Sequence, residues 1–393
     1  MLPQVAVVGA GPAGLLAALL LAQRGLDVCV FEQAQSVSEW NSRSYSINLN
    51  QRGLNSLQHA GLLHQVHKEA LIRTRIIVKS GDKENVIERN PPQYAITRTA
   101  LTKLLTHALR AMPNADISHG VKVDDLNARE NGKLLELSLS NGDAKTFSHV
   151  IGADGKWSAI RTCSPFKHTG DKSKMYKYQE IKENSWGVSF SLTRWPDHVE
   201  KSLHVLKPQT PQIAMYLMLA PLLDGTASIS WVLFNEILAS YPWLQPTDGN
   251  IISWNGESEN NETLMRAKEL LGKEFPFLKT AGILDNICDM TISRRVSWIK
   301  VEDCLNACND RVVLIGDAGH CMTPSLGEGC NCALESAARL SEAIQKHLNE
   351  ADSAISTDIL DRSFKEFGES RLKEVLDVQL RSAMASSVFQ NSK

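Results

Sequence analysis

The chain has 393 residues, of which 43% are hydrophobic and 22% charged, and its formal net charge is −2 at pH 7. This composition is typical of a globular enzyme with two or three domains, and the near-zero charge gives no indication of binding to nucleic acid or to an anionic membrane. Eight cysteines are too few for a disulfide scaffold, and the longest apolar run, residues 13–22, is too short to span a bilayer. We see no signal peptide or C-terminal anchor and therefore expect a cytoplasmic protein.

Residues 5–32 predict a βαβ unit that binds a dinucleotide. A β-branched run ends in the sequence G-A-G-P-A-G, an apolar helical segment follows, and a second strand-like run ends at Glu32. Gly9 allows the tight turn, Gly11 lets the backbone approach a pyrophosphate, and Gly14 lets the helix pack closely on the strand. Phosphates would bind at the helix N-terminus and ribose hydroxyls at Glu32, so an ordinary turn is the weaker interpretation.

The next part of the sequence predicts a strand over residues 72–78 and a turn-rich segment over residues 81–92. A helix should follow, with Thr97 or Thr99 as its N-cap. These elements lead to a further strand that ends just before Asp154 and Gly155.

Between about residues 171 and 280 the pattern changes to a period of two. Polar and apolar residues alternate over residues 185–193 and again over residues 226–233. This period predicts half-buried strands of an antiparallel sheet. Four of the eight tryptophans lie between residues 186 and 243, which suits either the wall of an apolar pocket or plain core packing.

A third nucleotide-type segment begins with a buried strand over residues 312–315, which ends at Gly316 and Asp317. A loop with one proline and two glycines follows, and then a helix through Leu340. The tail carries apolar residues at helical spacing and predicts a helix packed on the body of the protein.

A zinc site is a weaker interpretation of this loop. The ligands that it would use are His320, Cys321, Cys330 and Cys332. Their spacing matches no usual zinc site, so we predict no metal. Cys304 and Cys308 lack the C-x-x-C spacing of a redox pair.

The three segments, in this order and at this spacing, resemble the group A flavoprotein monooxygenases, which are single-component FAD-dependent aromatic hydroxylases. The middle segment shares with that family Asp154, Gly155, Ser158 and Arg161, and the third shares Gly316, Asp317, Pro324, Gly327, Gly329 and Asn331. Within the group the chain is most similar to kynurenine 3-monooxygenase and its relatives, through residues 46–49, Arg52-Gly53, residues 72–77 and Gln93-Tyr94 ahead of Arg98. The resemblance covers nearly the whole chain.

The resemblance implies an α/β fold, α+β overall. A Rossmann-like FAD-binding domain of the para-hydroxybenzoate hydroxylase type would carry an inserted antiparallel β-sheet substrate domain and a C-terminal helix. We expect residues 1–70, 95–170 and 281–345 in the discontinuous FAD-binding domain, residues 71–94 and 171–280 in the substrate-binding sheet domain, and residues 346–393 in a C-terminal helical segment.

The resemblance also implies tightly bound FAD. The residues that we expect to bind it are Gly9, Gly11, Ala13, Gly14, Glu32, Arg98, Asp154, Gly155, Gly316, Asp317, Pro324, Gly327, Gly329, Cys330 and Asn331. Asp317 would hold the ribityl and pyrophosphate region, Arg98 would lie along the FAD, and Asp154 would brace the loops. The helix that begins near Gly329 would aim its N-terminus at the N1/C2=O edge of the flavin.

The chemistry implied by the resemblance belongs to the cofactor, so no catalytic side chain is expected. NAD(P)H, with NADPH favoured, would dock transiently and reduce the flavin, and O₂ would then form a C4a-hydroperoxide that hydroxylates an aromatic ring. The residues expected to contact that substrate are Arg75, Arg89, Tyr216, Trp231 and Ser325. The protein must orient the ring and exclude water.

Arg75 matches the arginine that pairs with the substrate carboxylate in kynurenine hydroxylases, and an exposed arginine on a strand edge is the alternative. The sequence departs from the family at Arg89, where a tyrosine is expected, at Ser325, where a bulky aromatic is expected, and at Glu328, where a glutamine is expected. These departures favour an aromatic compound that differs in shape from kynurenine.

Two other possibilities stay open. A flavin-dependent epoxidase, halogenase or antibiotic-modifying hydroxylase would use the same scaffold, although the W-x-W-x-I motif of the halogenases is missing from the sequence. A non-catalytic protein that binds flavin or another ligand is the alternative from a different class. The expected partners are a small aromatic substrate and O₂, with no nucleic acid and no membrane anchor, and the protein would be a monomer or a homodimer.

Overall fold

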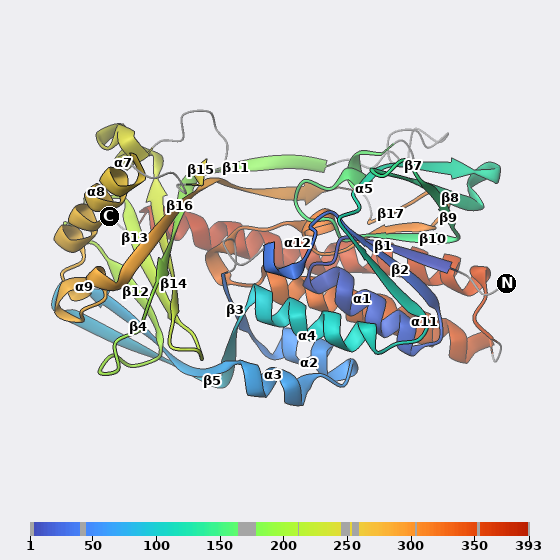
Figure 1. The fold of residues 1–393 in the computed structure, drawn as a ribbon, viewed down its shortest axis with the longest axis horizontal. Helices are drawn as coiled ribbons and strands as arrows, with labels where there is room; N and C mark the ends of the chain where they lie inside the picture. The colour runs from blue at the N-terminus through green and yellow to red at the C-terminus, as the bar shows by residue number, and fades with distance from the viewer. Residues whose placement is uncertain are drawn as a thin grey trace.

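The computed structural model describes residues 4–39, 45–163, 178–210, 212–244, 252–253, 259–302, 305–351 and 354–391. The molecule is elongated, with a six-stranded sheet and its helices at one end and a nine-stranded sheet at the other (Figure 1). A three-stranded sheet lies beside the first; it consists of β7 (Val123–Arg129), β8 (Leu134–Leu139) and β9 (Ala144–Phe147).

The six-stranded sheet is parallel apart from its edge strand β17. In spatial order its strands are β17 (Asn306–Ala307), β18 (Val312–Leu314), β10 (His149–Gly152), β1 (Gln4–Val8), β2 (Asp27–Glu32) and β6 (Ala115–His119). The helices around it are α1 (Pro12–Gln23), α2 (Gln51–His59), α3 (Leu63–Glu69), α4 (Arg98–Arg110) and α11 (Gly329–Ala351). Residues 13–22 of α1 are all buried, as expected for a helix that is apolar all round. The predicted βαβ unit is confirmed.

The nine-stranded sheet is antiparallel apart from the pair β12–β4. In spatial order its strands are β15 (Ile252–Ser253), β16 (Ile287–Val301), β11 (Tyr178–Leu192), β14 (Ala227–Phe234), β13 (Met215–Pro221), β12 (Leu203–Lys207), β4 (Leu71–Ser80), β5 (Lys83–Thr97) and β3 (Ser46–Leu49). The two period-two segments form β11 and β14, which pair from Ser185–Phe234 to Leu192–Ala227. This sheet draws strands from ranges that we expected in both domains, since β3 and β16 belong to it. The domain boundaries stay a prediction.

Two local predictions between β4 and α4 had different outcomes. The segment expected to be turn-rich is instead most of β5, so that prediction was wrong. Its prolines, Pro91 and Pro92, are tolerated because they fall at the register shift between the Arg75–Glu88 and Arg73–Gln93 pairs, where β5 makes no ladder hydrogen bonds with β4. The expected N-cap is confirmed, because the Thr97 hydroxyl accepts the backbone N–H of Ala100 at 3.0 Å.

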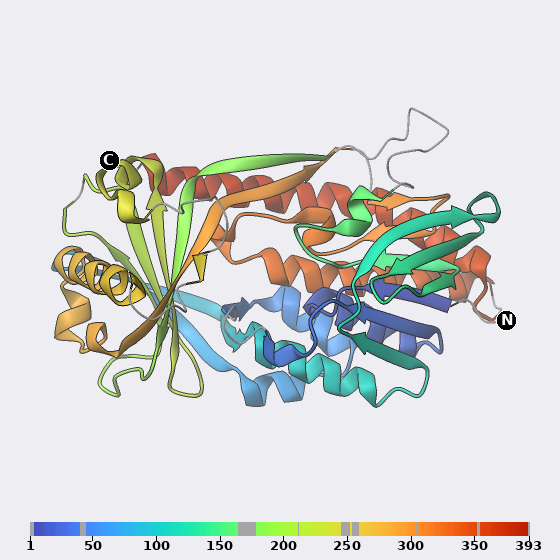
Figure 2. The same ribbon diagram turned by 45° about the horizontal axis from the view of Figure 1, so that its top comes forward.

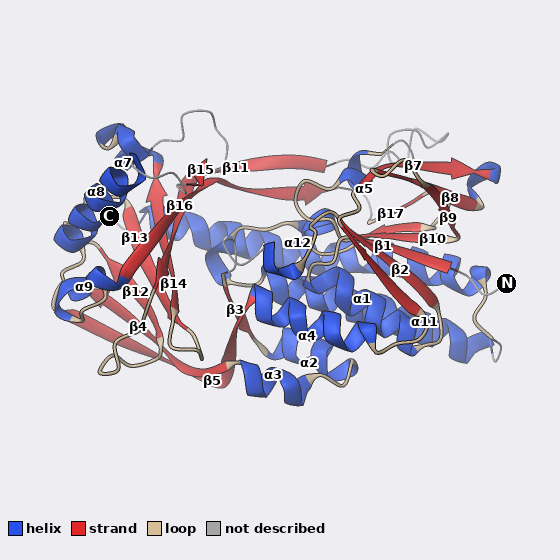
Figure 3. Ribbon diagram, viewed as in Figure 1, coloured by secondary structure: helices blue, strands red, loops and turns tan. Residues whose placement is uncertain are grey.

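Three helices cover one face of the nine-stranded sheet (Figure 3). They are α7 (Asn235–Ser240), α8 (Glu259–Glu274) and α9 (Phe277–Thr280). Together with that face they form an apolar core that includes Val188, Leu217 and Leu271. The opposite face of the sheet is turned toward the six-stranded sheet (Figure 1). The long C-terminal helix α12 (Thr357–Asn391) runs past both sheets, which confirms the predicted C-terminal helix (Figure 2).

Candidate active site

The carboxyl ends of four neighbouring parallel strands bring the three sequence motifs together. Gly9 follows β1, Glu32 ends β2, Asp154 follows β10, and Gly316 follows β18. The carboxyl edge of such a sheet is where open α/β folds bind their ligands. The candidate site is therefore assembled from segments that are more than 300 positions apart.

The glycines of the first motif differ in what surrounds them. A Cβ on Gly9 would lie 2.5 Å from the carbonyl oxygen of Ala153, and a Cβ on Gly14 would lie 2.0 Å from the carbonyl oxygen of Gly9. Gly11 has no such neighbour within 4 Å. Packing therefore requires glycine at two positions, whereas Gly11, the N-cap of α1, has open space beside it where a pyrophosphate would fit.

The Glu32 carboxylate is buried and holds the glycine turn. Its Oε2 accepts the backbone N–H of Ala10 at 2.8 Å, and its Oε1 accepts the backbone N–H of Ala34 at 2.8 Å. Each carboxylate oxygen has a second lone pair, so both remain able to accept a ribose hydroxyl. This arrangement fits the adenosine end of FAD.

Asp154 braces the middle motif, as the resemblance implied. Its Oδ2 accepts the backbone N–H groups of Ala159 at 2.7 Å and Ile160 at 3.2 Å. Its Oδ1 is buried and has no hydrogen-bond partner within the described part of the chain. Burial raises the pKa of this carboxyl above its ordinary value. The neighbouring Arg161 donates to the carbonyl oxygen of Ala318 at 2.6 Å and so ties the middle motif to the third.

Side chains of the third motif and its neighbours are accessible to solvent and yet enclosed by protein. The Asp317 side chain is exposed to solvent. Desolvation by the surrounding protein nevertheless raises the pKa of its carboxyl, although the positive charges of Arg98 and Lys156 act to lower it. Tyr45 is 49% exposed, and desolvation likewise raises the pKa of its hydroxyl. A side chain that is accessible and still enclosed by protein lies on a cleft wall. Cys330 belongs to the same group, since Asp317 and Arg98 both act on its thiol, whose pKa burial raises to about 12.

Tyr45 is one residue of this cleft that sequence reasoning missed. It precedes β3, in a short polar stretch with no periodic pattern, so no sequence signal marked it. Its backbone carbonyl accepts the N–H of Arg98 at 3.0 Å, which links it to the start of α4.

The start of α11 is fixed by Asn331. Its Nδ2 donates to the carbonyl oxygens of Asn48 at 2.9 Å and Gly327 at 3.1 Å, and its Oδ1 accepts the backbone N–H of Asn50 at 3.1 Å. A Cβ on Gly53 would lie 2.4 Å from that Oδ1, which explains the glycine there. Because Cys330 lies near Asp317 and Arg98, the first turn of α11 offers its free N–H groups and positive dipole end to the cleft.

The loop before α11 is tied to α12. The Ser325 hydroxyl lies 3.2 Å from Thr323 Oγ1, which in turn lies 2.9 Å from the buried hydroxyl of Ser382. Ser325 follows Pro324 in a 3₁₀ turn that closes at Gly327, whose φ is +66°. These contacts hold Ser325 in the loop that precedes α11, whereas Arg75 lies elsewhere.

Arg75 does not face the cleft. Arg75 is 47% exposed and donates to Glu88 Oε1 at 3.0 Å. It shares its side of β4 with Lys79, whose ammonium lies 4.6 Å from the ring centroid of Phe277 in α9. That side is the helix-covered face of the sheet. Arg89 is exposed on β5. The alternative interpretation of Arg75, a surface arginine, agrees with the geometry better than a carboxylate anchor.

Trp231 and Tyr216 lie on opposite faces of the sheet. Trp231 is fully buried in the helix-covered core, where it stacks on Phe190 and its Nε1 lies 3.1 Å from Met215 Sδ. It is paired in register with Leu217, so the adjacent Tyr216 points the other way. Burial raises the pKa of the Tyr216 hydroxyl to about 12. Of the two, only Tyr216 can contribute to the wall that faces the cleft.

A buried polar network supports the third motif from behind. Arg371 of α12 donates to Glu335 Oε2 at 2.7 Å and to Ser336 Oγ at 3.0 Å, and Arg52 donates to the same Glu335 oxygen at 2.8 Å. His320 Nε2 lies 2.9 Å from Ser336 Oγ. Burial, aided by the charge of Arg371, lowers the pKa of His320 to about 3. Its ring is therefore neutral at physiological pH.

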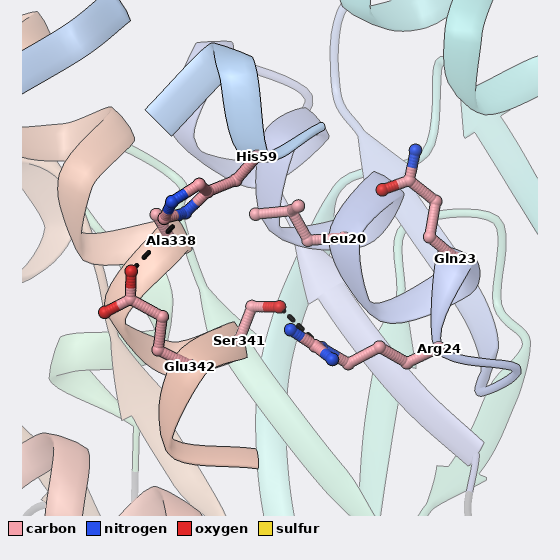
Figure 4. Close-up of a pocket in the computed structure, with 7 residues that line it drawn as sticks. All are labelled: Leu20, Gln23, Arg24, His59, Ala338, Ser341 and Glu342. Carbon is pink, nitrogen blue, oxygen red and sulfur yellow. Dashed lines mark hydrogen bonds and ion pairs between the residues drawn. The ribbon is translucent and has the colours of Figure 1, made fainter. Parts of the chain in front are cut away.

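A separate polar pocket of about 370 Å³ lies at the far end of α1. Its walls carry Arg24, which donates to Ser341 at 2.7 Å, and His59, which lies 3.4 Å from Glu342 (Figure 4). It contains none of the residues that we expected to bind FAD or substrate. Within the described ranges no three His, Cys, Asp or Glu side chains are grouped to hold a metal, and no helix there is long and apolar enough to cross a membrane.

Comparisons with known proteins agree with the family that the motifs indicate. The FAD binding domain family model matches residues 3–362. Kynurenine 3-monooxygenase of Salinispora arenicola is 25% identical, over 88% of this chain and 74% of the relative. Kynurenine 3-monooxygenase of Neurospora crassa is 24% identical, over 98% of this chain and 80% of the relative.

Among solved structures, p-nitrophenol 4-monooxygenase of Pseudomonas putida has a TM-score of 0.74 at 20% identity, covering 100% of this chain and 90% of that chain. 2-Methyl-3-hydroxypyridine-5-carboxylic acid oxygenase has a TM-score of 0.73 at 19% identity, covering 99% of this chain and 91% of that chain. The chain belongs to the FAD binding domain family and is an FAD-dependent monooxygenase.

Proposed function

We propose that this protein is a single-component enzyme that uses NAD(P)H and O₂ to hydroxylate an aromatic small molecule. The observation that carries the proposal is the cleft where the Gly11 turn, Asp317, Arg98 and the start of α11 meet. FAD held there would supply electron transfer from NAD(P)H and the activation of O₂. NADPH is the favoured hydride donor in this proposal, which rests on the family resemblance.

The side chains of the cleft would hold FAD along its length. In this proposal the pyrophosphate lies on the Gly11 turn, Glu32 accepts the ribose hydroxyls, and Asp317 and Arg98 contact the region between them and the flavin ring. The N–H groups at the start of α11 would stabilise negative charge on the ring. Solvent-accessible but desolvated groups such as Asp317 support this fit, because they mark a cavity enclosed by protein.

The substrate would lie between the flavin and the exposed face of the nine-stranded sheet. On that face the central strands present Ser189, Tyr216 and Ser230, which alternate with the buried core residues. These groups are uncharged hydrogen-bond partners, and Arg75 lies on the other face. We therefore propose an aromatic substrate recognised through neutral hydroxyl, amino or carbonyl substituents, in place of a carboxylate paired with Arg75.

Purified protein provides the test. Released FAD should approach one equivalent, and a panel of neutral phenols and anilines should stimulate NADPH oxidation more than matched aromatic acids do. Hydroxylated product and H₂O₂ are measured together, because product must account for the extra NADPH. A protein that holds no flavin, or whose NADPH oxidation no aromatic compound stimulates, would contradict the proposal.

A further inference from the structure

Arg73 of β4 is a buried arginine without an acidic partner. It is 2% exposed and among the largest fully buried side chains. Its Nη1 donates to Asn48 Oδ1 and its Nη2 donates to the carbonyl oxygen of Pro221, while its Nε has no partner in the described part of the chain. Burial lowers its pKa to about 10. A buried cation with only neutral partners carries a free-energy cost, so its retention calls for a role beyond packing.

The guanidinium bridges a place where the nine-stranded sheet is interrupted. The strand β12 begins at Leu203, which pairs with Ile76 of β4, so it does not extend as far as Arg73. On the other side of β12, its second residue, His204, pairs with Leu219 of β13. Pro221 lies two positions further along β13 and is therefore past the start of β12. With no strand between β4 and β13 at this level, Arg73 connects them directly.

The same guanidinium reaches the flavin side of the molecule. Asn48, which accepts from Arg73, belongs to β3, and its backbone carbonyl accepts from Asn331 Nδ2 at 2.9 Å. Asn331 is buried in the first turn of α11 and also binds the carbonyl of Gly327 at 3.1 Å. An unbroken hydrogen-bonded chain thus runs from the end of β13, through Arg73 and Asn48, to the loop that we place against FAD.

We propose that Arg73 is a positioning residue that sets the distance and orientation between the sheet that carries the substrate and the N-terminus of α11 at the flavin. The proposal rests on the proposed function above. It requires arginine, because the planar fork binds two acceptors on two different segments at once, and the single ammonium of lysine cannot reproduce that geometry.

The test uses full-length flavin-bound enzyme with Arg73→Lys and Arg73→Met. Both should keep FAD but shift the flavin visible spectrum and midpoint potential, and the fraction of NADPH converted to product should fall about ten- to a hundredfold, as small misplacements of a substrate do. Asn48→Ala cuts the same chain while leaving Arg73 in place, and should reproduce the effect even if the Arg73 variants fold poorly.

Arg75→Lys and Arg75→Met are the matched controls, since Arg75 lies two residues along the same strand and is exposed. They should leave the spectrum, the potential and the coupling ratio as in the unmodified enzyme. If the Arg73 and Asn48 variants lose only thermal stability while all three flavin readouts stay unchanged, Arg73 is structural and the inference is wrong. An unmodified protein without flavin or turnover would instead contradict the proposed function itself.

Discussion

Arg161 of α5 (Ala159–Thr162) donates a hydrogen bond to the carbonyl oxygen of Ala318 at 2.6 Å, although 157 positions separate the two residues. The segment after β10 and the segment after β18 are joined by this contact. Because the two strands are parallel neighbours, one guanidinium holds two walls of the cleft together. The two distant motifs therefore behave as parts of a single site.

Replacing Arg161 with alanine should destabilise the protein and weaken FAD binding. The buried carbonyl oxygen of Ala318 and the partly buried one of Lys156 would lose their donor, and the free energy of unfolding should fall by about 2–4 kcal/mol. Urea unfolding with and without added FAD measures both effects. Arg266→Ala, at an exposed ion pair with Glu262 on α8, is the control. Equal losses of unfolding free energy in the two variants would show that the buried contacts of Arg161 contribute no more to stability than an exposed ion pair does.

The glycines of the first motif should separate folding from cofactor binding. Gly14→Ala would force a Cβ into the carbonyl of Gly9 and should lower the stability of the FAD-free protein by about 1–3 kcal/mol. Gly11→Ala meets open space and should leave that stability unchanged, while its methyl group obstructs the pyrophosphate and raises the FAD dissociation constant about tenfold or more. Thermal unfolding and flavin titration measure the two quantities. Unchanged FAD affinity in Gly11→Ala would place the pyrophosphate elsewhere.

Features that depend on local sequence could be predicted from it. The strand, glycine turn, apolar helix and terminal acid around Glu32 are neighbours in the chain, so their pattern alone predicts the β1–α1–β2 unit. The alternation over β11 and β14 is also local, and it predicts strands without reference to the rest of the fold.

Features that depend on which face is covered could not be predicted. The register between β13 and β14 places Trp231 and Tyr216 on opposite faces, and the position of α8 and α9 decides which face is core. The face that Arg75 occupies depends on pairing with β5, where the register shifts between Arg73 and Arg75. Two prolines made this part of β5 resemble a turn, because the sequence does not reveal that they fall at a register shift, where no ladder hydrogen bond is lost.

The buried His320 should make stability fall as the pH is lowered. Its pKa is about 3 in the folded protein and about 6.5 when unfolded, so between these values the unfolded chain binds more protons. Stability that is present above pH 6.5 is then lost with a slope of about 1.4 kcal/mol per pH unit. Unfolding free energies at pH 7.5 and 5 should differ by about 2 kcal/mol more in the unmodified protein than in His320→Gln.

His59→Gln provides the control for this measurement, because His59 is an exposed histidine on the neighbouring α2. A pH effect of the same size in that variant would remove His320 as the cause. The readout uses the FAD-free protein, so a change in cofactor affinity with pH does not enter the comparison.

Substrate binding should depend on Tyr216 and not on Arg75. Tyr216→Phe removes a hydroxyl from the face of the sheet that we place against the substrate, and KM should rise about fivefold or more, as expected for one hydrogen bond. Arg75→Ala removes a surface ion pair with Glu88 and should leave KM unchanged. Steady-state NADPH oxidation coupled to product, with the best compound of the aromatic panel, measures both. A large rise in KM for Arg75→Ala with none for Tyr216→Phe would return the carboxylate anchor to Arg75, and aromatic acids would then become the substrates to pursue.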